Sequence, residues 1–296
     1  MATLRKLHKM ALPGAFPGMG AVRSALAGSV RDIFNDRERG ETPVIRSDNA
    51  LYPAGSVIRR VHGDVTSMMV GGVTALLLQM LHPAALAGIW DHSSFRDDML
   101  GRLRRTARFI AVTTFGERAA AEQAIARVRE VHGHVRGVLP DGTCYSATDP
   151  RLLAWVHVTE ATSFLDAWIR YGEPAMSRAD QDRYFQEFAD IARALGADPV
   201  PQTRAEAHSL LGSFRPELVA DERTRAVAVK VLHQPSPSPL MAPVQQLVMH
   251  AAVDLLPAWA RRMHELRPSR IATPLVRGAT AGVAKTLRWA FAKPRR

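Results

Sequence analysis

Cysteine, strand-like patterning and uninterrupted apolar sequence are all scarce in this chain, and each shortage excludes a class of protein. The single cysteine, Cys144, rules out an internal disulfide, a cysteine-based zinc site and the Cys-x-x-Cys-His attachment of a c-type haem. This cysteine usage is compatible with a reducing cytoplasm, where we expect the protein to reside. Few segments alternate apolar with polar residues, so we expect very little sheet.

Long hydrophobic runs are missing as well. The most apolar stretch, Val65–Trp90, is interrupted by Gln79 and by His82-Pro83, and its clean apolar part is shorter than the ~20 residues of a membrane span. We interpret this stretch as a buried core helix that breaks at His82-Pro83. Prolines and glycines at positions 13–18 interrupt any apolar segment near the N-terminus, so we expect no secretion signal.

The chain does contain enough apolar sequence for a large core, because 47% of its 296 residues are hydrophobic. Residues 1–50 are rich in glycine, proline and charge, and we predict an N-terminal extension with one short helix near Ala21–Phe34. Residues 51–296 are predicted to form a single globular all-α domain that includes a basic C-terminal helix. Periodicity predicts helices at residues 65–81, 84–90, 102–114, 117–136, 150–171, 177–195, 203–213, 221–232, 241–254 and 256–265.

Two local signals organise the middle of the chain. Asp149-Pro150 is typical of a helix start, because aspartate caps the helix and proline fits its first turn. The Pro-Asp-Gly sequence at 140–142 is turn chemistry, so residues 137–148 should form a turn or a short hairpin.

Positive charge is concentrated at one end of the sequence. The net charge is +11, and the segment from Arg261 to Arg296 contains ten Lys or Arg residues and one acid, Glu265. Small and apolar residues alternate with these bases, which favours a helix lying on an anionic membrane surface or on the domain itself. A solvated terminal helix is the alternative. We expect no nucleic-acid binding, because the inner helix faces lack an exposed recognition helix.

One histidine shares a helix face with apolar residues. Ile125, Val128, His132 and Val135 recur at helical spacing and therefore lie on one side of the predicted helix. Three polar residues fall on the other side: Arg127, Glu130 and His134. An imidazole directed into a core needs either a hydrogen-bond partner or a metal. His132 is thus the first candidate metal ligand.

Two further helices direct polar side chains inward. Arg102 and Thr106 are four residues apart on one face, and Arg105 borders that face. In the helix at 150–171, one stripe contains Leu153, His157, Glu160 or Ala161, Phe164 and Trp168. An inward arginine needs an anion, which is either a core carboxylate such as Glu160 or Asp166, or a haem propionate.

An inward imidazole, inward arginines and a wholly helical apolar pocket are the parts of a b-type haem site. The same parts also occur as buried ion pairs in helical proteins, and His157 could bond a backbone carbonyl instead. Other chemistries lack their motifs, because the chain has no His-Glu-x-x-His, no Glu-x-x-His repeat, no Walker loop, no Rossmann fingerprint and no Gly-x-Ser-x-Gly. His82 and His92 are interpreted as structural residues.

Five motifs occur in an order that resembles a known family. They are Leu76-Leu-Leu-Gln-Met-Leu-His-Pro83, Asp91-His-Ser-Ser-Phe95, Gly101-Arg-Leu-Arg-Arg-Thr106, Val131-His-Gly-His-Val-Arg-Gly137 and Tyr145-Ser-Ala-Thr-Asp-Pro-Arg-Leu-Leu-Ala-Trp-Val-His157. The chain resembles the DUF2236 group, the oxygenase MpaB family, which is related to the latex-clearing proteins (rubber oxygenases). The resemblance covers roughly residues 50 to 290.

The resemblance implies a globin-like helical core around one non-covalent b-type haem. His132 matches the axial iron ligand of the latex-clearing relatives. Arg102 and Thr106 match two residues beside the haem, whereas Arg105 stands where the relatives have a lysine. The relatives also have a glutamate proposed as catalytic base, and this chain has only apolar residues at the comparable position, around Leu86.

These observations lead to a leading hypothesis and an alternative. The first is a haem-dependent oxygenase or oxidase that acts on a hydrophobic, isoprenoid-like small molecule with O2, its electron donor being unknown. His132 would bind the iron, Arg102, Thr106 and His157 would hold the cofactor, and Arg105 and His157 would be the catalytic candidates. The alternative is a helical protein that binds haem or lipid without turnover, peripheral to a membrane through its basic C-terminal helix.

Overall fold

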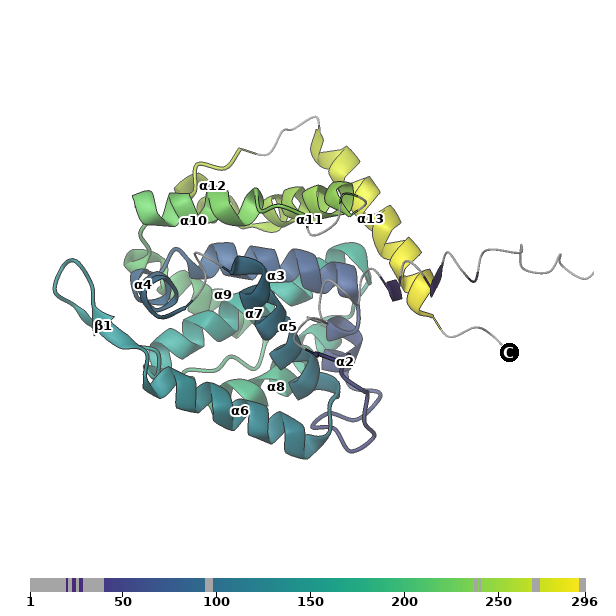
Figure 1. The fold of residues 1–296 in the computed structure, drawn as a ribbon, viewed down its shortest axis with the longest axis horizontal. Helices are drawn as coiled ribbons and strands as arrows, with labels where there is room; N and C mark the ends of the chain where they lie inside the picture. Colours follow the sequence, from purple (N-terminus) through teal and green to yellow (C-terminus); the bar gives the residue numbers. More distant parts are fainter. Residues whose placement is uncertain are drawn as a thin grey trace, which may run out of the picture.

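The structure, a computed structural model, describes residues 40–93, 98–236, 239, 241–267 and 272–292, with residues 20, 23, 24, 27 and 28 near the N-terminus. Helices dominate these residues, so the predicted all-α fold is confirmed (Figure 1). The helices are α2 (Val57–His62), α3 (Val65–Gln79), α4 (Pro83–His92), α5 (Met99–Phe115), α6 (Arg118–Gly133), α7 (Pro150–Tyr171), α8 (Arg178–Leu195), α9 (Arg204–Ser213), α10 (Glu222–Leu232), α11 (Ala242–Leu255), α12 (Ala258–Met263) and α13 (Ala272–Phe291). A 3-10 turn, η2, spans Arg215–Glu217.

All ten predicted helices are present, with ends that differ by a few residues. The start of α7 has the capping geometry that the Asp149-Pro150 sequence predicts. The Asp149 carboxylate accepts hydrogen bonds from the backbone N–H groups of Arg151 and Leu152, and Pro150 occupies the first turn. The short helix α2 was not predicted. The helix predicted at 21–34 falls mostly outside the described residues.

The apolar stretch breaks where the sequence predicts. Helix α3 ends at Gln79, α4 begins at Pro83, and the two axes are bent by 104°. His82 caps α4, because its Nδ1 accepts a hydrogen bond from the N–H of Ala84 at 3.2 Å. In the described part of the chain no single helix is long and apolar enough to cross a membrane, although the bent α3–α4 pair passes on length and composition.

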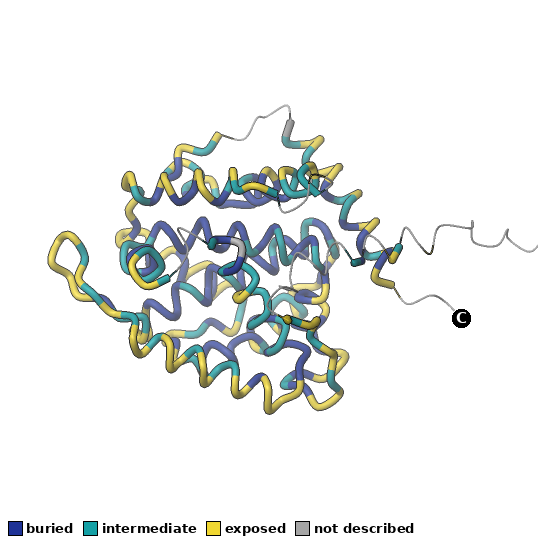
Figure 2. The backbone as a smooth tube through the Cα atoms, viewed as in Figure 1, coloured by how far each residue is buried: buried dark blue, intermediate teal, exposed yellow. Residues whose placement is uncertain are grey.

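Helices α3 and α7 cross at the centre of the core (Figure 2). The crossing depends on Gly71, because a Cβ at that position would lie 2.9 Å from both the Ser163 carbonyl oxygen and the Phe164 Cα. The largest fully buried side chains around it include Trp155 and Tyr184. This close contact fixes the position of α7, which carries several of the candidate site residues.

A short hairpin follows α6, as predicted. Its strands are β1 (Arg136–Val138) and β2 (Cys144–Ser146), which pair antiparallel with Val138 opposite Cys144. The hairpin extends away from the helical body (Figure 1). Cys144 is exposed and free.

The basic C-terminal helix α13 lies on the domain itself, beside α11 and α3. Arg277 forms two hydrogen bonds with the buried Asp254 carboxylate, at 2.7 and 3.0 Å. Arg288 donates to the buried Asp64 carboxylate at 2.8 Å. Two arginines near opposite ends of the helix thus anchor it to buried acids.

Candidate functional site

Helix α6 presents the predicted stripe to the domain. Ile125, Val128, His132 and Val135 are half-buried. The residues predicted for the opposite side are exposed: Arg127, Glu130 and His134. The Nδ1 atom of His134 forms a hydrogen bond of 2.9 Å with the Glu130 carbonyl oxygen of the preceding turn. The helical periodicity therefore oriented the two neighbouring histidines correctly.

His132 has the protonation state that an iron ligand needs. Burial lowers the pKa of its imidazole, and the nearby Arg102 guanidinium lowers that pKa further. The ring is therefore neutral at physiological pH, and neutral imidazole is the form that binds metals. No described residue forms a hydrogen bond with this ring.

Arg102 lies on the first turns of α5, and no described carboxylate forms an ion pair with its guanidinium. Its half-buried guanidinium has a pKa lowered to about 10, mainly by burial and secondarily by the charge of Arg105. The Glu160 carboxyl acts in the opposite direction, so the two groups are close enough to interact. Among the described residues, however, none forms a hydrogen bond or an ion pair with the Arg102 guanidinium. A desolvated arginine of this kind is a binding position for an anion.

The expectation that Thr106 faces inward is wrong. Thr106 and Arg105 are both exposed, and Arg105 forms an ion pair with Asp98 at 3.5 Å. The reason is that neighbouring elements leave this turn of α5 uncovered, although Met99 before it and Thr113 and Thr114 after it are buried. The N-terminal half carries Arg102 at the edge of the interior and Thr106 at the surface.

His157 on α7 is buried, as its stripe predicts. Its Nε2 atom has no hydrogen-bond partner among the described residues, so the proposed bond to a carbonyl is not seen at that atom. The ring lies edge-on to Phe188, with centroids 4.9 Å apart. Burial lowers its pKa to about 4, with a smaller contribution from Arg193, so the imidazole is neutral.

From the sequence, Glu160 was predicted only as a core carboxylate that could pair with an inward arginine. It lies one turn after His157, and its half-buried side chain forms a hydrogen bond with Gln79. Burial raises the pKa of this carboxyl to about 7, against the opposing effects of Gln79 and Arg102. A carboxyl that titrates near neutrality can hold or release a proton under physiological conditions. Its position on the helix face that also carries His157 was the sequence signal that could have identified it as a site residue.

The structure therefore gathers three of the candidates and separates the others. Arg102 on α5 interacts electrostatically with both His132 on α6 and Glu160 on α7. His157 is deeper, against α8, and Arg105 and Thr106 are at the surface. In the described ranges, no three His, Cys, Asp or Glu side chains meet as a site for a bare metal ion.

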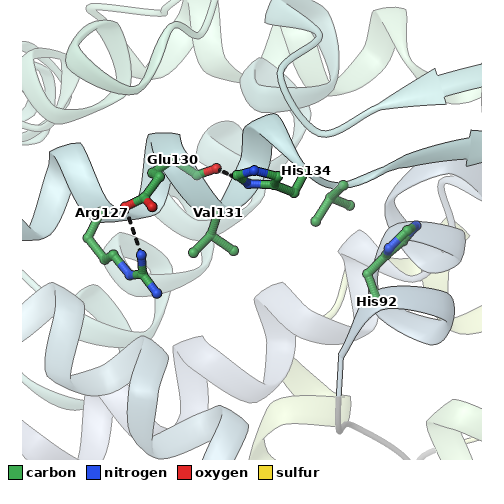
Figure 3. Close-up of a pocket in the computed structure, with 6 residues that line it drawn as sticks. His92, Arg127, Glu130, Val131 and His134 are labelled. Carbon is green, nitrogen blue, oxygen red and sulfur yellow. Dashed lines mark hydrogen bonds and ion pairs between the residues drawn. The ribbon is translucent and has the colours of Figure 1, made fainter.

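A surface pocket of about 350 Å³ lies between α6 and α4 (Figure 3). The residues that line it are His92, Arg127, Glu130, Val131, His134 and Val135. Figure 3 shows the Arg127–Glu130 ion pair on one side and His92 across from it. None of the candidate residues lines this pocket, because it faces the outer side of α6.

The sequence matches a family model described as "ER-bound oxygenase mpaB/B'/Rubber oxygenase, catalytic domain" over residues 59–289. The match spans well over half of the chain, so the chain belongs to this family of oxygenase catalytic domains. No curated protein and no solved structure matches the chain.

Proposed function

We propose that this protein is an oxygenase that uses a non-covalently bound b-type haem, with His132 as the iron ligand. Membership of an oxygenase family supports the class of reaction. The observation that carries the cofactor is the pairing of His132 and Arg102. A neutral imidazole without a hydrogen-bond partner and a desolvated guanidinium without an ion-paired carboxylate lie on adjacent helices. An iron ion and a propionate would satisfy both groups.

The residues present fit a haem in both charge and polarity. His132 would bind the metal, and Arg102 would pair with a propionate carboxylate. Arg105 and Thr106, exposed one turn further along α5, would add donors at the solvent side. When bound, the haem would supply redox-active iron for the activation of O2.

Two residues of α7 would handle protons at this site. The Glu160 carboxyl holds a proton below about pH 7 and releases it above, and Gln79 and Arg102 keep it oriented. His157 offers an unoccupied Nε2 one turn away. We propose that Glu160 exchanges a proton with a substrate or oxygen species and that His157 holds a bound group in position.

The substrate we propose is a hydrophobic small molecule. Helices α5 and α7 also carry partly buried apolar side chains that pack against the core, namely Leu103, Phe109 and Val156. The family name also refers to rubber, a hydrocarbon. Helix α4 offers no acid where the relatives have their glutamate, since Leu86 is a buried apolar residue. That absence favours the second candidate, a protein that binds haem or lipid without turnover.

Haem titration followed by oxygen uptake tests the proposal. Protein mixed with haem should develop a bound-haem spectrum, and with ascorbate and squalene it should consume O2. Arg102→Met should weaken haem binding roughly tenfold, the loss of one charge-assisted contact. Arg108→Met is the matched control, because Arg108 is on the same helix but bonds the Thr42 carbonyl oxygen. Haem binding without substrate-dependent uptake would favour the binding protein, and no haem binding would refute the haem oxygenase.

A further inference from the structure

The charged side chains of α13 are directed at the domain. Arg277 is bonded to Asp254 and Arg288 to Asp64, and the carboxylates are 7% and 4% exposed. A surface helix ordinarily has its charges facing water and its apolar residues facing the core. Here two of the three charged residues of the helix form ion pairs with buried acids, so few charges remain for the outer face.

The outer face of α13 is apolar. Leu275 is 73% exposed and Trp289 is 43% exposed, and the Arg23 guanidinium lies 6.0 Å from the centroid of the Trp289 ring. Between Leu275 and Trp289 the outward positions are uncharged and mostly small: Gly278, Ala279, Gly282 and Thr286. Helical spacing places these residues on one side, opposite the buried Thr280, Ala284 and Leu287. Large exposed apolar groups aligned along one helix are typical of an interaction surface.

The sequence around this helix is strongly basic. After Glu265, every charged residue of the sequence is a base: Arg267, Arg270, Arg277, Lys285, Arg288, Lys293, Arg295 and Arg296. Lys285 is exposed at the edge of the apolar face. An anionic partner complements this charge, whereas a second copy of the same helix would be repelled.

We propose that the outer face of α13 docks on an anionic lipid surface. The helix would lie in the plane of the interface, with Leu275 and Trp289 among the lipid chains and the basic residues among the head groups. Tryptophan favours that boundary, because its ring is apolar and its N–H is polar. The arginine anchors to Asp254 and Asp64 would keep the domain attached to the helix at the membrane. This inference does not depend on the haem.

Vesicle sedimentation tests the docking. The full chain should bind phosphatidylcholine vesicles that contain phosphatidylserine, bind pure phosphatidylcholine weakly, and lose affinity in high salt. Leu275→Glu with Trp289→Glu should reduce the partition coefficient at least about tenfold, since both apolar contacts are lost. The control is Val138→Glu, a 63% exposed valine in the β1 hairpin, far from α13 (Figure 1). It should bind like the unmodified chain.

A second measurement guards against a folding defect in the double variant. Brominated lipids in the anionic vesicles should quench part of the tryptophan fluorescence, and Trp289→Phe should remove that part. Equal binding to both vesicle types, or equal binding by the double variant, would overturn the proposal. So would a dimer in solution that Leu275→Glu with Trp289→Glu dissociates, because the face would then belong to a second copy.

Discussion

Two neighbouring regions of the interior differ in whether their buried polar groups have hydrogen-bond partners. In the first, both ring nitrogens of His62 are used, Nδ1 with the Thr114 hydroxyl at 2.9 Å and Nε2 with the Tyr184 hydroxyl at 3.0 Å. In the second, the Arg102 guanidinium has no hydrogen-bond or ion-pair partner among the described residues, and the Nε2 of His157 has no hydrogen-bond partner there. Both His62 and His157 contact the Phe188 ring, at 5.0 and 4.9 Å between centroids.

This difference distinguishes buried polar groups that stabilise the fold from those that are available to bind a ligand. Buried polar groups in folded proteins are nearly always hydrogen-bonded, and each exception needs an explanation. A satisfied group such as His62 stabilises the fold and rigidifies it. An unsatisfied one costs stability unless a water, an ion or a ligand completes it, and in the second region we propose that a bound ligand does so.

Replacing the two histidines should have unequal effects on stability. His62→Leu should lower the free energy of unfolding by about 3 kcal/mol, because two buried hydroxyls lose their partner. His157→Leu should change it by less than about 1 kcal/mol, since no bond at Nε2 is lost. Urea denaturation of each variant measures both values. Equal losses would show that His157 is bonded in the same way as His62.

The two arginines allow a parallel comparison. Arg59 is buried and donates to the Tyr52 carbonyl oxygen at 3.0 Å. Arg59→Met should therefore destabilise the protein by about 1–2 kcal/mol, the loss of charged hydrogen bonds. Arg102→Met should be neutral within about 0.5 kcal/mol or stabilising, because it removes a desolvated charge. Thermal unfolding without added haem checks this, and a large loss for Arg102→Met would show that Arg102 has a structural partner.

The two regions should also respond to pH with opposite signs. Burial lowers the pKa of His62 to about 3, so unfolded chains gain a proton first and stability falls as pH drops below about 6.5. Burial raises the pKa of Glu160 to about 7, so its contribution is lost as pH rises from about 4.5 towards 7. Glu160→Gln should therefore gain roughly 1 kcal/mol at pH 8, allowing for partial exposure, and nothing at pH 4. Unfolding measured at both pH values tests this, and a gain independent of pH would contradict it.

The smallest effect is expected at the surface of α5. Thr106→Ala should change stability by less than about 0.5 kcal/mol, because the side chain is exposed. Its effect on haem affinity should be smaller than that of Arg102→Met. Parallel haem titrations compare the two variants. A larger effect for Thr106→Ala would place the cofactor nearer the surface than Arg102.

Much of the fold could be predicted from the sequence, because its helices carry explicit signals. Asp149-Pro150 and the break at His82-Pro83 mark helix ends through local chemistry that does not depend on the rest of the chain. Helix α2 was missed because six residues carry too little periodicity to recognise. His62, at its end, was missed with it.

The sequence predicted which way the site side chains point, but not how deeply they are buried. Periodicity showed which way His132 and His157 point, since that follows from helix geometry. It placed Thr106 inside, because spacing along α5 cannot reveal how far its neighbours cover it. The raised pKa of Glu160 likewise depends on burial between separate helices, which one sequence does not show.

The most direct test of the account is a visible absorption spectrum of the haem-reconstituted protein beside two histidine variants. His132→Ala removes the proposed ligand, and His134→Ala removes an exposed histidine two residues further along the same helix. The account predicts a haem Soret band that His132→Ala abolishes or strongly shifts and that His134→Ala leaves unchanged. No band in the unmodified chain, or the same band in all three proteins, would contradict the assignment of His132 as the iron ligand.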